Sequence, residues 1–328
     1  MSDTFIPLDG WGHDEAPFHE GERAIQRRVG VETKMGPHGR RAIRSFMPDQ
    51  HREFFAQLPF LIAGTVDRTG QPWASILTGR PGFLATPDDR TLTVAALPPT
   101  GDPLNAGLVP ESPIGLLGIE LPTRRRNRAN GIVTRLGPNG FIVAIRQSFG
   151  NCPKYIQART PETVGIPSTG DAPRISDGLD ETDRALIAGT DTFFIATAHT
   201  APAAGFAGGV DVSHRGGKPG FVRVEGNRLT VPDFIGNFFF NTLGNLAVEP
   251  RAGLLFPDFA TGDLLYLAAT GEIVWDGPEV EQFTGAQRLM RLDVTRAIRL
   301  TGALPFRWSA PEYSSVLDRT GQWGATEQ

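Results

Sequence analysis

The sequence predicts a mainly β protein with a few helices, built from two similar halves. Short segments rich in Val, Ile, Leu, Phe and Thr alternate with turn sequences such as DRTGQ and FATGD, a pattern typical of antiparallel barrels and sandwiches. Similar segments recur in the same order after roughly 135 to 150 residues, which indicates an internal repeat. We therefore expect two β domains of related topology.

Each half is expected to begin with a helix that leads into a strand. PDQHREFFAQLPFLIAGT (48–65) and DETDRALIAGTDTFFIAT (180–197) both place apolar residues at helical spacing before an apolar run. Four further matches follow in order: GRPGFL (79–84) with GKPGFV (217–222), LTVAA (91–95) with LTVPD (229–233), PIGLLGIE (113–120) with RAGLLFPD (251–258), and NGIV (130–133) with GEIV (271–274).

These repeats set the expected domain boundaries. We expect an N-terminal extension at 1–45, a first β domain at 46–157, a linker at 158–179, a second β domain at 180–312 and a tail at 313–328. Pro, Ser, Thr and Gly are frequent in the linker, as in surface loops. The extension is expected to wrap the surface or to add one helix near EGERAIQRRVG, and its residues indicate little about chemistry.

Composition excludes several classes of function. The chain has 328 residues, 40% of them hydrophobic, and a net charge of -4, so no overall basic field would attract nucleic acid or a membrane surface. The single cysteine, Cys152, excludes an intrachain disulfide and a Cys-based metal site. We predict no metal, and we expect the cytoplasm, because no leader pattern or long apolar run is present.

Two motifs resemble the FMN-binding split barrel of pyridoxamine 5'-phosphate oxidase and its relatives. One runs from VDVSHRGGKPGFV through LTVPDF to NLAVEPRAGLLF, and the other is RRRNRANG (124–131). The resemblance covers roughly residues 46–156 and 180–310. It implies two tandem split barrels packed as a pseudo-dimer, with FMN at their interface and an oxidoreductase activity on a small organic substrate. Vitamin B6 phosphate oxidation itself is not expected, because the family's substrate-phosphate contacts are not evident.

The loop in GNFFFNTLGNLAVEP predicts a phosphate site. It leads into a short helix running to about Glu249, and the amino terminus of a helix favours anions. The adjacent Arg and Lys of the resembling family fall here approximately on Asn241 and Thr242. Either the positive charge comes from elsewhere in this chain or the phosphate is held less strongly. An ordinary helix capped by Asn is the alternative.

The preceding strand, DVSHRGGK, offers a cation. Alternation places Asp211, Ser213 and Arg215 on one face, and Val212 and His214 on the other. The resemblance implies phosphate binding by Arg215 and a flavin contact from Ser213. His214 is a weak candidate for a catalytic acid or base, and packing against the flavin is an equal alternative.

The arginine-rich strand is expected to complete the site from the first half. Alternation places Arg124, Arg126, Arg128 and Asn130 on one face, and arginines in this number require anions or solvent. The matching segment of the second half, DLLYLAATGEIV, is apolar, so we expect one retained site per chain. A solvated edge strand is the alternative.

Taken with the resemblance, these motifs predict one set of cofactor-binding residues: Ser213, His214, Arg215, Gly216, Asp233, Asn237, Asn241, Thr242, Leu243, Gly244 and Asn245 from the second half, and Arg126, Arg128, Lys154 and Tyr155 from the first.

The sequence is also compatible with other functions and cofactors. A flavin carrier without turnover is one alternative, and a split barrel that uses haem or deazaflavin is another, with His199 or His214 as haem ligands. NADH, NADPH or another donor would supply electrons to the enzyme, and a homodimer is possible. Cys152 is expected to pack as a small apolar residue, with a redox thiol as the alternative.

Overall fold

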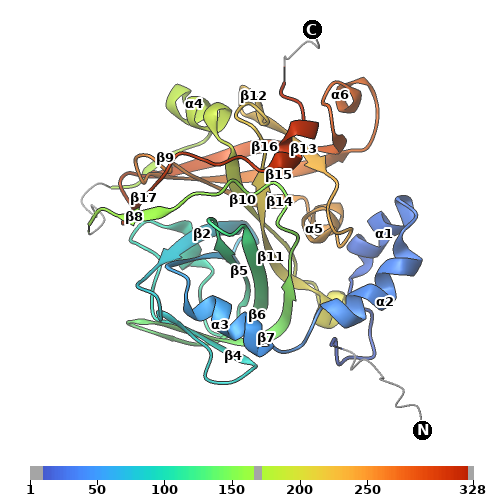
Figure 1. The fold of residues 1–328 in the computed structure, drawn as a ribbon, viewed down its shortest axis with the longest axis vertical. Helices are drawn as coiled ribbons and strands as arrows, with labels where there is room; N and C mark the ends of the chain where they lie inside the picture. Colours follow the sequence, from blue (N-terminus) through green and yellow to red (C-terminus); the bar gives the residue numbers. More distant parts are fainter. Residues whose placement is uncertain (1–9, 166–171, 324–328) are drawn as a thin grey trace.

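The computed structural model describes residues 10–165 and 172–323 and confirms a mainly β fold with few helices. Two large antiparallel sheets lie against each other, with short helices at their edges (Figure 1). The first sheet has the strand order β2-β1-β5-β6-β7-β4-β3. Its strands are β1 (Phe60–Val66), β2 (Pro72–Thr78), β3 (Leu84–Ala85), β4 (Thr91–Val94), β5 (Pro113–Glu120), β6 (Arg125–Gly137) and β7 (Gly140–Gly150).

The second sheet repeats this order as β11-β10-β14-β15-β16-β13-β12, with β9 added beside β16. Its strands are β9 (Arg174–Ser176), β10 (Thr192–His199), β11 (Gly209–Gly216), β12 (Arg223–Glu225), β13 (Arg228–Phe234), β14 (Arg251–Pro257), β15 (Leu264–Val274) and β16 (Ala286–Leu300). A separate pair joins β8 (Pro161–Thr163) to β17 (Phe306–Trp308). Both β8 and β9 lie in the segment 158–179 that was expected to be a linker. The domain boundaries given above remain a prediction.

Short helices precede or connect these strands. The α-helices are α1 (Glu20–Arg28), α2 (Glu32–Ala42), α3 (Asp49–Ala56), α4 (Glu181–Gly189), α5 (Asn241–Val248) and α6 (Pro278–Glu281), and the 3-10 helices are η1 (Pro103–Ala106), η2 (Pro202–Ala207) and η3 (Ser315–Arg319). As predicted, α3 and α4 lead into β1 and β10. In the N-terminal segment, α1 confirms the helix expected near EGERAIQRRVG, and α2 is a second helix that was not expected. None of the helices in the described ranges has the length and apolar character needed to span a bilayer.

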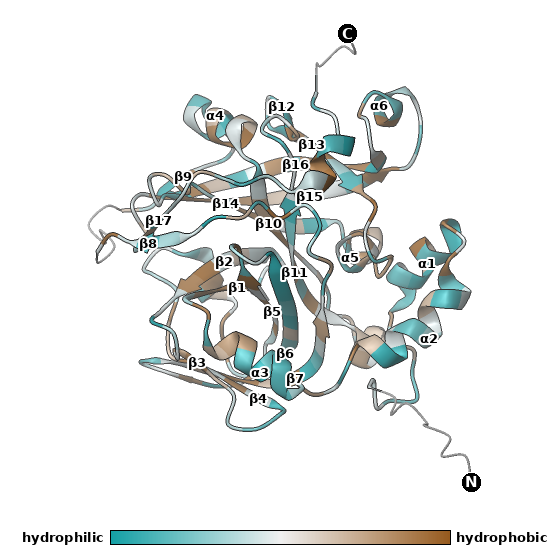
Figure 2. Ribbon diagram, in the orientation of Figure 1, coloured by the Kyte–Doolittle hydropathy of each residue, from teal (hydrophilic) through white to brown (hydrophobic). Residues whose placement is uncertain are grey.

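The strands at the centre of the molecule are buried on both faces. Leu61 and Ala63 of β1 belong to the core of the first sheet, whereas Phe60 and Ile62 join a core shared by both sheets. In β10 the shared core takes Phe194, because successive side chains of a strand point to opposite faces. Hydrophobic residues accordingly run along β1 and β2 in Figure 2.

Two glycines in matching positions allow the sheets to approach closely. A Cβ at Gly115 of β5 would lie 2.4 Å from the carbonyl oxygen of Val210 on β11, and a Cβ at Gly253 of β14 would lie 2.1 Å from that of Pro72 on β2. Gly115 and Gly253 occupy the same place in the matched segments PIGLLGIE and RAGLLFPD. The contact between the sheets is therefore pseudo-symmetric.

Strand pairing corrects one of the repeat matches. In β5 and β14, Leu117 pairs with Arg128 and Leu255 pairs with Tyr266. Arg128 and Tyr266 are therefore counterparts, which shifts NGIV against GEIV by three residues. Both strands carry an irregularity nearby, between Asn130 and Gly131 in β6 and within β15. These irregularities lie at matching positions in the two halves, so they do not cause the three-residue shift.

Candidate functional site

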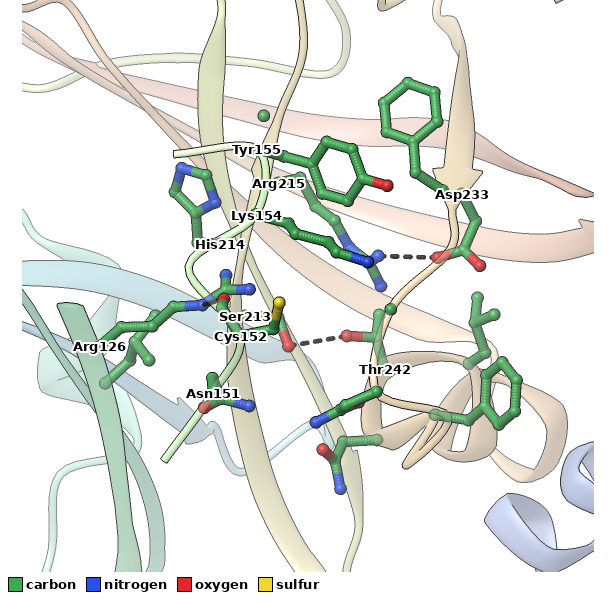
Figure 3. A pocket seen from close by; sticks show the side chains of 18 of the residues that line it. Arg126, Asn151, Cys152, Lys154, Tyr155, Ser213, His214, Arg215, Asp233 and Thr242 are labelled. Carbon is green, nitrogen blue, oxygen red and sulfur yellow. Dashed lines mark hydrogen bonds and ion pairs between the residues drawn. The ribbon is translucent and has the colours of Figure 1, made fainter. Parts of the chain in front are cut away.

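A cavity lies where the two sheets and α5 meet. It contains about 930 Å³ of space, part of it open to solvent, and its walls come from β6 and the 151–155 segment on one side and from β11, β13 and α5 on the other. All the residues predicted to bind a cofactor line it except Gly244 and Asn245. Figure 3 shows that the side chains of Arg126, Lys154 and Arg215 extend toward the space between β11 and the loop before α5.

Gly244 and Asn245 lie behind the cavity wall, so their predicted place in it was wrong. A Cβ at Gly244 would lie 2.4 Å from Cγ of Glu22, which shows that this glycine allows α1 to pack against α5. The side-chain amide of Asn245 donates to Asp211 and to Thr197, each at 3.1 Å. Both residues support the wall from within.

Arg126 and Lys154 bring unpaired positive charge to the cavity. The Nε of Arg126 donates to the carbonyl oxygen of Cys152 at 2.9 Å, and within 10–165 and 172–323 neither cation forms an ion pair. Burial, together with the charges of Arg128 and Arg215, lowers the pKa of Arg126 to about 9. An anion bound nearby would stabilise this guanidinium, because it would offset the burial and the repulsion from the neighbouring arginines. Two such cations in one cavity therefore favour an anionic ligand.

Arg128 is neutralised within the protein. Its guanidinium lies 2.5 Å from Asp211 and also donates to Ser213, while Thr242 of α5 donates to the same hydroxyl at 2.9 Å. Asn130 donates to Asp211 at 2.9 Å. The network joins β6 of the first sheet to β11 and α5 of the second, so Arg128 holds the two halves of the cavity together.

Unlike Arg126 and Arg128, the neighbouring Arg124 and Arg125 do not line the cavity. Arg124 was expected on the cavity face of the strand, but it lies in the preceding turn with φ of 58° and pairs with Glu312 at 2.9 Å. Arg125 lies over the ring of Phe54. The alternative of a solvated edge is also wrong, because β6 is paired on both sides, by β5 and by β7.

Arg215 shares one carboxylate with a second arginine that sequence reasoning missed. Arg215 lies 2.8 Å and Arg288 lies 3.4 Å from Asp233. The trio holds one net positive charge and borders the cavity through Arg215 and Asp233. Arg288 stands directly opposite Asp233 in the pairing of β13 with β16, and that pairing joins segments too distant in sequence to be foreseen.

His214 lines the cavity with both ring nitrogens buried and without a partner in the described part of the chain. Burial, with the charges of Arg126 and Arg215, lowers its pKa well below the ordinary value, so the ring is neutral near pH 7. Gly216, two residues on, lies under the 151–155 segment, since a Cβ there would be 2.0 Å from the carbonyl oxygen of Tyr155. The 151–155 segment therefore packs closely on the end of β11, beside the buried ring of His214.

The start of α5 presents backbone donors rather than a capped end. Its N-cap residue is Phe240, which has φ of 64° and offers no side-chain cap, so the alternative of an Asn cap was wrong. Asn237 instead accepts from the backbone N–H of Phe239 at 3.2 Å. The first N–H groups of a helix have no partner within it, and here Asn241, Thr242 and Leu243 line the cavity.

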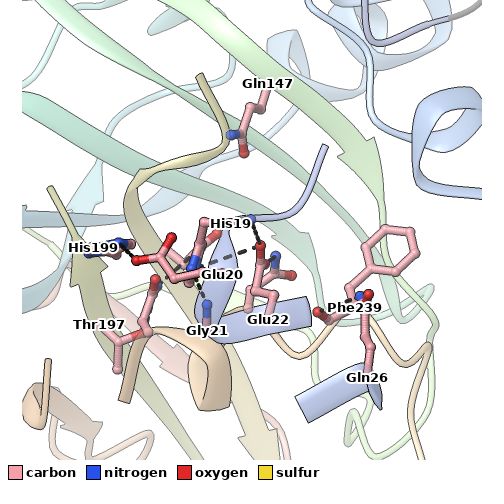
Figure 4. Close-up of polar contacts among 12 residues, drawn as sticks. His19, Glu20, Gly21, Glu22, Gln26, Gln147, Thr197, His199 and Phe239 are labelled. Carbon is pink, nitrogen blue, oxygen red and sulfur yellow. Dashed lines mark hydrogen bonds and ion pairs between the residues drawn. The ribbon is translucent and has the colours of Figure 1, made fainter. Parts of the chain in front are cut away.

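Helix α1 supplies a contact to this loop that sequence reasoning did not foresee. The carboxyl group of Glu22 lies 2.6 Å from the side-chain amide of Asn241. It also accepts from the backbone N–H of His19 at 3.0 Å, as Figure 4 shows. Glu22 is 2% exposed, and a buried carboxyl requires such partners. The capping-box pattern of His19 and Glu22 could have predicted the start of α1, but no pattern indicates its contact with α5.

The pseudo-symmetric counterpart of the cavity is closed. Tyr266, in the register position of Arg128, donates to Asp102 at 2.8 Å, and Ser75, in the position of Ser213, donates to the same oxygen. Burial raises the pKa of Asp102 to about 6. At this position an uncharged, buried tyrosine replaces the arginine and a buried carboxyl group is its partner, so the position does not suit an anionic ligand.

His199, considered above as a haem ligand, lies outside the cavity. Its Nε2 is 2.6 Å from the carboxylate of Glu20, and its ring stands edge-on to that of His19. His19 Nδ1 accepts from the N–H of Gly21, so Nε2 carries its proton. We assign this group to hydrogen bonding at the start of α1. Cys152 also lines the cavity and is half-buried rather than packed in a core.

No family model matches the sequence, and neither does any curated protein. Solved structures overlap parts of the chain. A HupZ variant from Group A Streptococcus aligns at 14% identity over 37% of this chain and 98% of its own, with a TM-score of 0.30. A candidate pyridoxamine 5'-phosphate oxidase from Lactobacillus delbrueckii aligns at 15% over 37% and 94%, with a TM-score of 0.29. A FAD-binding protein from Mesorhizobium loti aligns at 11% over 39% and 96%, with a TM-score of 0.27. At this level of similarity, function must be argued from the chain's own geometry.

Proposed function

We propose that this protein binds FMN in the cavity between its two sheets and acts as an oxidoreductase on a small organic substrate. One observation carries the proposal: two unpaired cations, Arg126 and Lys154, face the open start of helix α5 across a space with aromatic walls. Cations and helix termini suit a phosphate, and aromatic walls suit a planar ring. FMN combines both features in one molecule.

The residues present fit such a ligand. The buried Nε atoms of Arg128 and Arg215 and both ring nitrogens of His214 have no partner in the described ranges, and buried polar groups without partners are costly. The backbone N–H groups at the start of α5 would hold the phosphate, with Lys154 as counter-ion. Tyr155 and Phe234, whose rings lie 5.0 Å apart, would border the ring system.

A bound flavin would supply hydride or electron transfer, and the protein would supply position and charge. Arg126 stabilises negative charge in the cavity, because its own burial disfavours a lone cation. His214 offers one donor and one acceptor from a neutral ring. We do not assign it as the catalytic acid or base, since its low pKa leaves it without a proton to give near pH 7.

Purified protein provides the first test. Its visible spectrum should show the two bands of a flavin, either as isolated or after addition of FMN, and mass analysis of the released ligand should identify FMN. Absence of flavin absorption under both conditions would contradict the proposal. Repeated turnover with NADH or NADPH and an electron acceptor would then separate an oxidoreductase from a carrier, which would bind flavin without turnover.

A further inference from the structure

The buried carboxyl group of Glu22 faces the side-chain amide of Asn241. The two groups are 2.6 Å apart and form a hydrogen bond between α1 and α5. The nitrogen and oxygen of an asparagine amide exchange places by a half-turn of the group. The contact can therefore form in two ways: an ionised Glu22 accepts from the NH2 group of Asn241, or a protonated Glu22 donates to its amide oxygen.

The surroundings of Glu22 favour the protonated form. The ionisable groups that face it are His19 at the start of α1, His199 on β10, Asp211 on β11 and Arg128 on β6. Arg128 is committed to Asp211, and burial with the neighbouring His199 lowers the pKa of His19 to about 4, which leaves His19 neutral. Burial, reinforced by the Asp211 carboxylate, raises the pKa of Glu22 well above its ordinary value.

The proton can be placed on one oxygen. Oε2 of Glu22 accepts from the backbone N–H of His19, so the proton belongs on Oε1, which faces Asn241. When Oε1 donates to the amide oxygen of Asn241, the NH2 group of Asn241 no longer donates to Glu22. Asn241 lines the cavity, and its second amide atom has no hydrogen-bond partner in the described part of the chain.

We propose that Glu22 binds a proton and acts as a positioning residue, turning the NH2 group of Asn241 toward the phosphate of the ligand. The inference rests on the function proposed above. Asn241 then supplies a phosphate donor at the position where the resembling family has a cation. Ionised Glu22 would instead draw the NH2 group to itself, present the amide oxygen to the phosphate and add a nearby negative charge. Phosphate binding is thereby coupled to protonation of Glu22.

Comparison of FMN with riboflavin, which lacks the phosphate, tests this inference. Dissociation constants of both flavins would be measured for the wild type and for Glu22→Gln between about pH 6 and pH 9, where a linked group can change affinity by up to about tenfold per pH unit. In the wild type the preference for FMN should fall as Glu22 ionises. In Glu22→Gln the preference for FMN over riboflavin should stay, at every pH, at the value that the wild type shows at low pH. The reason is that the NH2 group of glutamine donates a hydrogen bond as the protonated acid does. Titration of the phosphate itself, near pH 6, affects both proteins equally.

Two further variants complete the test. Glu20→Gln removes an exposed carboxylate from the same helix and should behave as the wild type. Asn241→Ala should weaken FMN binding about tenfold, a typical effect of losing a hydrogen bond to a charged group, while riboflavin binding is retained and reports that the cavity is folded. Equal pH dependence in the wild type and Glu22→Gln, or equal loss of both flavins in Asn241→Ala, would overturn the inference. Failure of the wild type to bind either flavin would instead overturn the proposed function.

Discussion

Tyr266 occupies in the second sheet the register position that Arg128 occupies in the first. Arg128 pairs with Leu117 of β5, and Tyr266 pairs with the equivalent Leu255 of β14. Arg128 binds Asp211 at the border of the open cavity, whereas Tyr266 binds the buried Asp102 at the closed counterpart. One position therefore holds an ion pair beside a cavity that also contains Arg126 and Lys154, and the other holds a buried tyrosine and a carboxyl group.

Removal of Arg128 should destabilise the fold. Arg128→Met leaves the buried Asp211 without its cation, and breaking a buried pair in this way costs about 3–5 kcal/mol. Urea denaturation should show this loss in the free energy of unfolding. The double variant Arg128→Met/Asp211→Asn removes both charges and should recover a large part of it. If the double variant loses the sum of the two single effects, the ion pair is not the source of the stability.

Loss of either unpaired cation should weaken FMN binding without unfolding the protein. Arg126→Ala and Lys154→Ala each remove a charge-assisted contact, worth about 1.5–3 kcal/mol, or roughly tenfold to a hundredfold in affinity. Quenching of FMN fluorescence measures the dissociation constant. Arg124→Ala is a matched control, because Arg124 lies in the same arginine run but outside the cavity. Equal losses in all three variants would argue against a specific site.

Gly216 should tolerate no side chain. A Cβ at this position would lie 2.0 Å from the carbonyl oxygen of Tyr155, which is backbone and cannot easily move. Gly216→Ala should therefore displace the 151–155 segment, lower the melting temperature and weaken FMN binding. Gly189→Ala provides the comparison, since a Cβ there meets nothing within 4 Å. Equal melting temperatures for the two variants would contradict the close contact.

Asp102 should make stability depend on pH. Its pKa rises from 3.8 to about 6 on folding, so the folded state holds this proton more tightly than the unfolded state. Its contribution therefore favours folding at low pH and declines as pH rises from about 4 to about 6, by about 3 kcal/mol. Asp102→Asn keeps an acceptor for the N–H of Leu104 and removes the titration. Unfolding free energies of both proteins across this range should converge at low pH and diverge above it; parallel curves would show that Asp102 does not titrate there.

Many residues that line the cavity could be predicted from the sequence, because they lie in short segments with recognisable local patterns. Alternation along β11 and the polar loop before α5 each identify a short stretch, and Arg126 lies in the arginine-rich motif 124–131. The contact of Glu22 with Asn241 spans 219 positions, and its two helices meet through Gly21 and Gly244. Close packing of this kind leaves no periodic signal. The match of Arg128 with Tyr266 was missed because the two residues differ in type, and only the pairing of β5 with β6 and of β14 with β15 identifies them as counterparts.

Titration of FMN into the ligand-free protein tests the central claim most directly. The account predicts saturable binding of one FMN per chain, because the cavity bordered by Arg126 collects positive charge and its counterpart is closed by Tyr266 and Asp102. Isothermal titration calorimetry with a measured protein concentration gives this number. Two equivalent sites per chain, or no saturable binding, would contradict it.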